Sequence, residues 1–224
     1  MKPKIIILSL IILLLIGGVS YKFFKKKNLV NHEQFSHPAV QHPEVAGKRV
    51  VQRIALIEPK PAYNFKLLNY TKDTISLSDF KGKVVVIGFI YTHCPDVCGI
   101  LTMHYVQLQR IFKKEIGKSL ELIFITTDPE RDVPERVAAY TRGFKGKWYF
   151  LTGKREELEK VWESYYVFVK DNPRAGIVYH TYMIALIDRE GFIRYRYIGL
   201  VDPTNIIATD IKNLLKEKHE IQIS

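Results

Sequence analysis

The chain has 224 residues, of which 47% are hydrophobic and 25% are charged, and its formal net charge at pH 7 is +11. This length suits one substantial globular domain with an appendage and argues against two full domains. The charge does not indicate a nucleic-acid-binding protein, because no basic helix or aromatic-interleaved basic patch is present. Residues 1–60 hold 10 Lys and Arg against 3 Glu, and anionic lipid head groups are the natural counterpart there.

An apolar run opens the chain. IIILSLIILLLIGGVSYKFF, residues 5–24, carries a single charge and has about the 20 residues that a helix needs to cross a bilayer. We therefore predict an N-terminal membrane anchor over residues 1–24. A cleaved signal peptide is the alternative, since a short basic segment precedes the run and Gly18-Val19-Ser20 is a tolerable cleavage site. Both readings place the remaining chain on the extracytoplasmic side, although the flanking lysines give no clear positive-inside signal.

A polar tether is predicted over residues 25–49. Its second part, residues 31–49, contains two prolines and mixed polar residues without sustained periodicity. It also holds His32, His37 and His42, which are spaced five residues apart. This spacing aligns the histidines on neither a helix nor a strand, so an ordinary polar linker is favoured over a segment that gathers metal ions.

A globular domain without internal repeats is predicted over residues 50–224. VVVIGFIY (84–91) and LELIFITT (120–127) are apolar, β-branched runs of the kind expected for strands buried on both faces of a sheet, and KWYFLT (147–152) is a candidate third strand. Helices are expected over residues 98–116, 134–142 and 154–166, the second with proline near its start.

The last third of the domain changes character. KDNPRAGIVY (170–179) is interpreted as a flexible polar loop, TYMIALIDREGFIRYRYIG (181–199) predicts a β-hairpin, and a closing helix is expected from Pro203 to about residue 218. Parallel βαβ units followed by a C-terminal hairpin and a helix describe a mixed α/β sheet covered by helices. This order is compatible with a thioredoxin-like fold that carries an inserted helix.

The only two cysteines, Cys94 and Cys98, stand in YTHCPDVCG (91–99). Because Pro95 disfavours a helical Cys94 and suits the first helical position, we predict Cys94 as the N-cap and Cys98 one turn into the helix. Free backbone N–H groups at that N-terminus would favour a Cys94 thiolate.

The cysteine pair has three candidate uses: a structural disulfide, redox exchange and metal binding. A structural disulfide would close a very small loop and stabilise the chain by about 2 kcal/mol or less, so redox exchange and metal binding are the stronger hypotheses. Side chains one helical turn apart have Cβ atoms about 5–6 Å apart, whereas a relaxed disulfide needs about 3.5–4.5 Å. This spacing favours a metal without excluding a disulfide.

Two thiolates leave most metal ions short of ligands, so a histidine is expected as a third. His93 ends a strand and points away from the cysteines, His104 lies on another side of the helix, and His219 is in the C-terminal tail. His180, where the polar loop meets a strand, is expected at the same sheet edge as the cysteines, although a histidine at a strand start is often an ordinary polar residue. A Cys₂His set favours Cu(I), with zinc as the alternative.

Three segments together resemble the Sco/SenC family of membrane-anchored copper proteins, over about residues 61–215. They are GKVVVIGFIYTHCPDVC, TTDPERDVPE and YHTYMIALIDREG, and they occur in that order. The resemblance implies a thioredoxin-like fold, copper held by Cys94, Cys98 and His180, and a role in maturing the dinuclear copper site of cytochrome c oxidase. It also implies that Asp128 orients groups around the copper; a capping role before Pro129 is the alternative.

Two departures from related patterns bear on the function. Gly99 stands where many relatives have proline, which leaves the ligands intact but could loosen the first helical turn. No proline stands at residues 181–182, where thioredoxin-like oxidoreductases usually carry a cis proline, and this weakens a general disulfide-exchange role. Tyr91, Tyr182 and Met183, which lie near these motifs, are assigned to the core.

The resemblance therefore implies an anchored copper chaperone and not a turnover enzyme. Its expected partners are a copper donor protein and the copper-bearing subunit of cytochrome c oxidase. A thiol–disulfide oxidoreductase that reduces the cysteines of that subunit, with Cys94 as the attacking thiolate, stays open as the alternative. A thiol peroxidase on the same fold is a weaker third hypothesis.

Overall fold

The computed structural model describes residues 52–199 and 204–217, which belong to the unit Pro43–Ser224 of the chain. The predicted anchor (1–24) and tether (25–49) lie outside the described residues, as do His32, His37, His42 and His219. Within the described ranges, no helix combines the length and the apolar character needed to cross a membrane.

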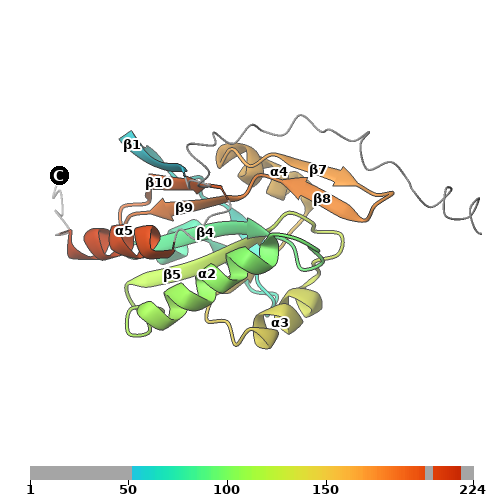
Figure 1. Ribbon diagram of the computed structural model, residues 1–224, viewed down its shortest axis with the longest axis horizontal. Coiled ribbons are helices and arrows are strands. Elements are labelled where there is room, and N and C mark those ends of the chain that lie inside the picture. Colours follow the sequence, from blue (N-terminus) through green and yellow to red (C-terminus); the bar gives the residue numbers. More distant parts are fainter. Residues whose placement is uncertain (1–51, 200–203, 218–224) are drawn as a thin grey trace, which may run out of the picture. The chain divides into compact units, whose positions relative to one another are not determined.

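The elements of the described residues alternate between strands and helices along most of the chain (Figure 1). In chain order they are β1 (Gln52–Pro61), β2 (Lys66–Leu68), β3 (Thr74–Ser76), the 3₁₀ helix η2 (Leu77–Phe80), β4 (Val84–Ile90), α2 (Cys98–Ile111), β5 (Leu120–Thr126), α3 (Pro134–Gly143), β6 (Tyr149–Leu151), α4 (Arg155–Ser164), β7 (Val169–Asn172), β8 (Ile177–His180), β9 (Met183–Ile187), β10 (Phe192–Ile198) and α5 (Thr204–Lys216).

A mixed six-stranded sheet forms the centre of the domain, in the order β1-β10-β9-β4-β5-β6. β4, β5 and β6 run parallel, with Val84 opposite Leu120 at the start of the β4–β5 pair. β9, β10 and β1 continue from β4 as antiparallel neighbours. The predicted βαβ units and the C-terminal hairpin β9–β10 are therefore confirmed, and parallel and antiparallel halves meet at β4.

Side chains from the central strands pack on both faces of this sheet. Along β4, Val84 and Val86 lie in a cluster with residues of α2, α3 and α5, whereas Val85 and Ile87 lie in a second cluster with α4, η2 and the β2–β3 hairpin. Burial on both faces explains why β4 and β5 are apolar at almost every position and do not alternate.

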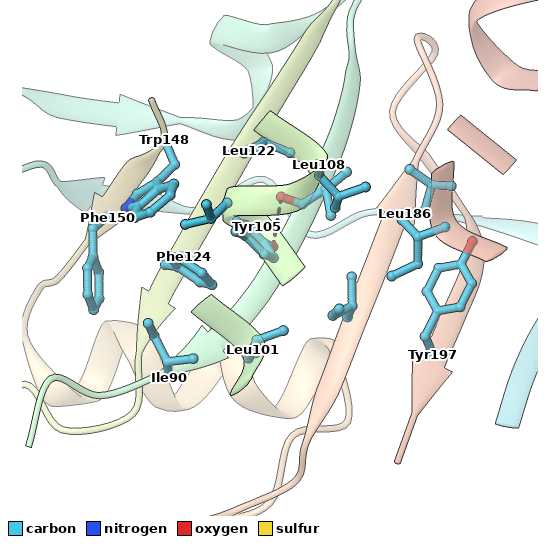
Figure 2. Close-up of a cluster of buried hydrophobic side chains, with 14 of the residues drawn as sticks. Ile90, Leu101, Tyr105, Leu108, Leu122, Phe124, Trp148, Phe150, Leu186 and Tyr197 are labelled. Carbon is cyan, nitrogen blue, oxygen red and sulfur yellow. Dashed lines mark hydrogen bonds between the residues drawn. The ribbon is translucent and has the colours of Figure 1, made fainter. Parts of the chain in front are cut away.

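Tyr105 fixes α2 on the sheet (Figure 2). Its hydroxyl donates to the carbonyls of Val86 (3.3 Å) and Ile123 (3.1 Å), and its ring stacks on Phe124 with centroids 3.9 Å apart. Tyr105 packs against Gly88 of β4, where a side chain would not fit. A Cβ at this position would lie only 2.8 Å from the Tyr105 hydroxyl oxygen. This close approach sets the position of α2, whose first residue is Cys98.

The structure corrects several sequence predictions. α2 ends at Ile111 and not near residue 116, because the backbone of Phe112 leaves the helical region while its side chain enters the core. Residues 170–179 are not a flexible loop, since β7 and β8 pair as a regular antiparallel hairpin. The edge strand β1 and the β2–β3 hairpin were not predicted; β1 is exposed along nearly its whole length and so lacks an apolar periodicity.

Candidate metal centre

The two cysteines lie in and just after the turn between β4 and α2. α2 begins at Cys98, and its N-cap is Val97 (φ −79°, ψ −17°). Cys94 lies before the helix, where its N–H donates to the carbonyl of Tyr91 (3.3 Å). The prediction that Cys94 caps the helix is therefore wrong, because Pro95 belongs to a bend that precedes the helix and not to its first turn.

The position of Cys94 outside α2 bears on whether the two cysteines can form a disulfide. The two cysteines are not joined by a disulfide in the structure. With Cys94 outside α2, the Cβ spacing of a regular helical turn does not apply to the pair, so that spacing no longer favours a metal over a disulfide. The choice between metal binding and redox exchange depends instead on what surrounds the two sulfur atoms.

Hydrogen bonds to Cys94 stabilise its thiolate. The Cys98 thiol donates to the Cys94 sulfur, and this is the main reason that the pKa of Cys94 is lowered to about 6, in spite of partial burial. The backbone N–H groups of Asp96 and Cys98 and the hydroxyl of Tyr91 also donate to it. In turn, the Cys94 thiolate and burial raise the pKa of Cys98. At neutral pH the pair therefore holds one thiolate, on Cys94, and one thiol, on Cys98.

His180 brings an imidazole against this pair. It is the last residue of β8, and its Nε2 lies 3.5 Å from Sγ of Cys98. Its Nδ1 lies 3.1 Å from the carbonyl oxygen of Thr181, which can only accept, so Nδ1 carries the proton and Nε2 presents its lone pair. Burial lowers the pKa of His180 and keeps the ring neutral. The single proton of the Cys98 thiol thus faces two acceptors, the Cys94 thiolate and Nε2 of His180.

The other two described histidines lie elsewhere. Nδ1 of His93 is 3.2 Å from Oγ1 of Thr92 and 3.9 Å from a carboxylate oxygen of Asp132. His104 is buried against α5, with Nδ1 3.1 Å from Oγ1 of Thr204. Of the three described histidines, His180 is the one whose ring nitrogen lies beside Sγ of Cys98, and its role as a ligand stays a prediction.

Cys94, Cys98 and His180 are linked as a chain through Cys98. Among residues 52–199 and 204–217, no group of three or more His, Cys, Asp or Glu side chains stands gathered closely enough to hold a metal ion. A metal that used these three donors would therefore have to draw Cys94 and His180 together around Cys98.

Asp132, which the sequence analysis did not single out, holds the start of the cysteine turn. Its side chain is fully buried and accepts hydrogen bonds from the N–H (3.1 Å) and the hydroxyl (2.5 Å) of Thr92 and from the hydroxyl of Thr126 (2.7 Å). Burial raises the pKa of Asp132, and its charge contributes to raising the pKa of Cys98. The available signal was the second aspartate of TTDPERD.

Asp128 lies at the start of the same loop and is buried. Its carboxylate forms a salt bridge with Nε of Arg131, and its carbonyl accepts the N–H of Asp132 (2.9 Å). Its own N–H donates to Oγ1 of Thr126 (2.9 Å). Asp128 therefore acts as a turn residue with its backbone while its carboxylate holds Arg131.

The three residues assigned to the core are buried, as predicted: Tyr91, Tyr182 and Met183. Tyr91 also joins the cysteine turn to the hairpin. Its hydroxyl accepts the N–H of Val178 (3.3 Å) and donates to Cys94, and its ring meets the ring of His180 edge to face, with centroids 5.9 Å apart.

A mixed sheet with helices on both faces, a dithiol at the start of the helix after β4 and a neutral histidine beside it define a thioredoxin-like domain with a dithiol–histidine site. The family model described as SCO1/SenC matches residues 58–216. The chain therefore belongs to the SCO1/SenC family.

Relatives and solved structures agree with this assignment. The chain is 31% identical over 196 residues to the mitochondrial SCO1 homolog of Mus musculus; the match covers 84% of this chain and 63% of that protein. The structure of Bradyrhizobium japonicum ScoI with copper bound is 32% identical in sequence and matches with a TM-score of 0.61. The match covers 69% of this chain and 99% of that chain. BsSco, in which a disulfide switch was identified, is a member of the Sco family of cytochrome c oxidase assembly proteins. Its structure is 26% identical in sequence and matches with a TM-score of 0.62, and the match covers 74% of this chain and 99% of that chain.

Proposed function

We propose that this chain is a membrane-anchored copper chaperone, which binds copper through Cys94, Cys98 and His180 and delivers it to the dinuclear copper site of cytochrome c oxidase. The observation that carries the proposal is that Nε2 of His180 lies 3.5 Å from Sγ of Cys98, which is itself hydrogen-bonded to Cys94. A metal ion bound by Cys98 would therefore have two further donor atoms beside it, Sγ of Cys94 and Nε2 of His180.

The chemistry of these donors fits copper. Two thiolates and an imidazole are soft or intermediate ligands, and thiolates select Cu(I) over hard ions. Near neutral pH, Cys94 is already a thiolate and His180 is already neutral, so loading requires the loss of one proton only, from Cys98. The Thr181 carbonyl that holds Nδ1–H keeps Nε2 directed at the sulfur, as such partners do for metal-bound histidines.

Differences in exposure suggest how copper would enter and leave. Cys98 is buried, while Cys94 is half-buried at the edge of the site. A thiol of a copper donor protein, or of the copper-bearing subunit of cytochrome c oxidase, would therefore reach the ion on the Cys94 side. Transfer would proceed by stepwise exchange of ligands, in which Cys94 releases the ion to the incoming thiol.

The proposal includes the location of the protein. Residues 5–24 would anchor it in a membrane, with the copper-binding domain on the extracytoplasmic side and residues 25–49 as the tether. The relative from Mus musculus is a mitochondrial protein. Asp128 would act around the copper without contacting it, through its salt bridge with Arg131.

Copper titration of the full chain in detergent tests the proposal. Under reducing conditions, we expect one Cu(I) per chain in competition with a chromophoric chelator, and at least tenfold weaker binding in His180→Ala. His93→Ala is the matched control, because His93 adjoins Cys94 in the chain while its Nδ1 lies beside Thr92 and Asp132, and the affinity of this variant should equal that of the wild type. Stoichiometric binding by a variant without both cysteines would overturn the proposal.

A second candidate function rests on the low pKa of Cys94. A thiolate with a pKa of about 6 beside a thiol is also suited to attack a disulfide, and the related BsSco has a disulfide switch. The chain would then reduce the cysteines of the acceptor subunit. His180→Ala separates the two functions: loss of oxidase maturation with intact thiol exchange supports copper delivery, whereas unaffected maturation supports reduction.

A further inference from the structure

The β7–β8 hairpin carries His180 but does not belong to the central sheet. β7 and β8 form a separate two-stranded sheet, with Val169 opposite His180. An isolated two-stranded hairpin is at best marginally stable in water. The position of the imidazole therefore depends on the contacts that hold this hairpin to the rest of the domain.

Arg131 makes such a contact at the hairpin turn. Its Nη1 donates to the carbonyl of Gly176 (2.8 Å), while its Nε binds the buried carboxylate of Asp128. The same guanidinium lies over the ring of Tyr91, with Cζ 5.7 Å from the centroid. One side chain thus joins the loop after β5, the residue at the end of β4 and the turn of the hairpin.

A second charged bridge connects the loop after β5 to strand β7 of the hairpin. Arg155 binds the carboxylate of Glu130 with two hydrogen bonds (2.6 and 2.7 Å) and also Asp171 of β7 (3.0 Å). The side chains of this bridge are partly exposed, so we expect it to contribute little by itself. Both bridges start from the segment 128–131.

We propose that Arg131 is a positioning residue that latches the hairpin, and that Asp128 in turn positions Arg131. With the latch closed, Nε2 of His180 stays beside Cys98; with the latch open, the hairpin moves as a unit and removes the imidazole. The Cys94–Cys98 hydrogen bond and the hydrogen bonds from Thr92 to Asp132 do not involve Arg131, whose contact with the cysteine turn is made over the ring of Tyr91. The part of this inference that concerns copper rests on the proposed function.

The first test needs no copper. Hydrogen–deuterium exchange of the full chain in detergent compares the wild type with Arg131→Gln. We expect amide exchange in β7 and β8 to accelerate at least tenfold while β4 and β5 stay unchanged. Arg174→Gln, which removes an exposed charge from the hairpin turn itself, is the matched control and should leave exchange unchanged. Equal protection of the hairpin in the wild type and Arg131→Gln would overturn the latch.

Removing Arg131 alone leaves the buried Asp128 carboxylate without its cation, which could unfold the loop. Asp128→Asn with Arg131→Gln removes both charges and should give the same local acceleration. Arg131→Lys should restore part of the protection, because an ammonium group keeps the charge but lacks the fork that spans both acceptors. Protection in Arg131→Lys no better than in Arg131→Gln would contradict the bridging geometry.

The second test asks whether the latch acts through His180. Arg131→Gln should weaken Cu(I) binding at least fivefold in the wild-type background and have no further effect in His180→Ala. An equal loss in both backgrounds would overturn the proposed route. If His180→Ala itself binds Cu(I) like the wild type, the proposed ligand set fails, while the exchange experiment still decides whether Arg131 holds the hairpin.

Discussion

Cys94 and Cys98 share one proton, and their neighbours decide where it resides. Three donors besides the Cys98 thiol point at the Cys94 sulfur, namely the backbone N–H groups of Asp96 and Cys98 and the hydroxyl of Tyr91, whereas the Cys98 sulfur is more deeply buried and lies beside Nε2 of His180. The thiolate is therefore the half-exposed Cys94, which is the sulfur that an incoming metal donor or disulfide reaches first. The same asymmetry serves copper capture and thiol exchange.

The low pKa of Cys94 gives a pH-dependent prediction. Because its pKa is about 6, the thiolate forms as the pH rises through 6 and is protonated below it. Cys98→Ala removes the main hydrogen bond to the thiolate, so the midpoint of the thiolate absorbance at 240 nm should rise toward the ordinary value of about 8.5. Cys98→Ser, which keeps a donor, should lie between. An unchanged midpoint in Cys98→Ala would show that Cys98 is not the cause.

Asp132 gives a second prediction at this scale. Asp132→Ala leaves the buried N–H of Thr92 and the hydroxyls of Thr92 and Thr126 without their acceptor, and should lower the free energy of unfolding by about 2–4 kcal/mol. Urea unfolding measures the loss. Asp96→Ala, an exposed aspartate of the cysteine turn, should stay within about 0.5 kcal/mol. Similar losses in both variants would contradict the assigned role.

At the scale of elements, the site depends on how α2 is seated and on the hairpin beside it. Tyr105 and Gly88 let α2 approach β4 and β5, which brings Cys98 to the carboxyl end of β4. The β7–β8 hairpin brings His180, the last residue of β8, next to Cys98. Neither element holds the complete donor set by itself.

The seating of α2 can be tested at Gly88. In Gly88→Ala, the new Cβ would lie 2.8 Å from the Tyr105 hydroxyl oxygen, which is held by two carbonyls, so the free energy of unfolding should fall by about 1–3 kcal/mol. Gly99→Ala is the control, because its Cβ meets no atom within 4 Å, and it should be neutral or stabilising by up to about 1 kcal/mol. Adding Tyr105→Phe should recover part of the Gly88→Ala loss; additive losses would contradict the close-contact explanation.

At the scale of the whole domain, the first described strand is tied to the last helix. Arg53 of β1 binds the buried carboxylate of Asp210 in α5 with two hydrogen bonds of 2.7 Å, and the hydroxyl of Tyr197 in β10 donates to the same carboxylate (2.7 Å). The β1–β10 pairing is interrupted between Ala55 and Lys60, so this ion pair supports an edge strand with few buried side chains.

Asp210→Ala tests this closure. It leaves the guanidinium and the buried Tyr197 hydroxyl without an acceptor, and should lower the free energy of unfolding by about 2–3 kcal/mol, since Arg53 is partly exposed. Hydrogen exchange should also accelerate in β1. Glu135→Gln, which breaks the exposed ion pair with Lys72, is the control and should leave the free energy of unfolding unchanged within experimental error. Unchanged exchange in β1 would show that the ion pair does not hold the strand.

Much of the fold could be predicted because its strongest signals are local. The apolar runs of β4 and β5 reflect burial on both faces, and Pro134 correctly indicated the start of α3. β1 could not be found this way, since an exposed edge strand is stabilised by its hydrogen bonds to β10 and by Arg53, not by its own pattern. The β7–β8 hairpin was missed because only Val178 of its eight strand residues is buried, so neither strand shows a clear apolar alternation.

The sequence by itself determined the family and the mixed α/β fold, and it singled out the two cysteines and His180 as candidate site residues. These features follow from residue type, short-range spacing and the order of motifs. Only the tertiary structure decided that Cys94 lies outside α2, that Nε2 of His180 lies 3.5 Å from Sγ of Cys98, and that Arg131 contacts both Asp128 and the turn of the β7–β8 hairpin. These depend on distances between segments far apart in the chain, such as Cys98 and His180, which local propensities do not specify.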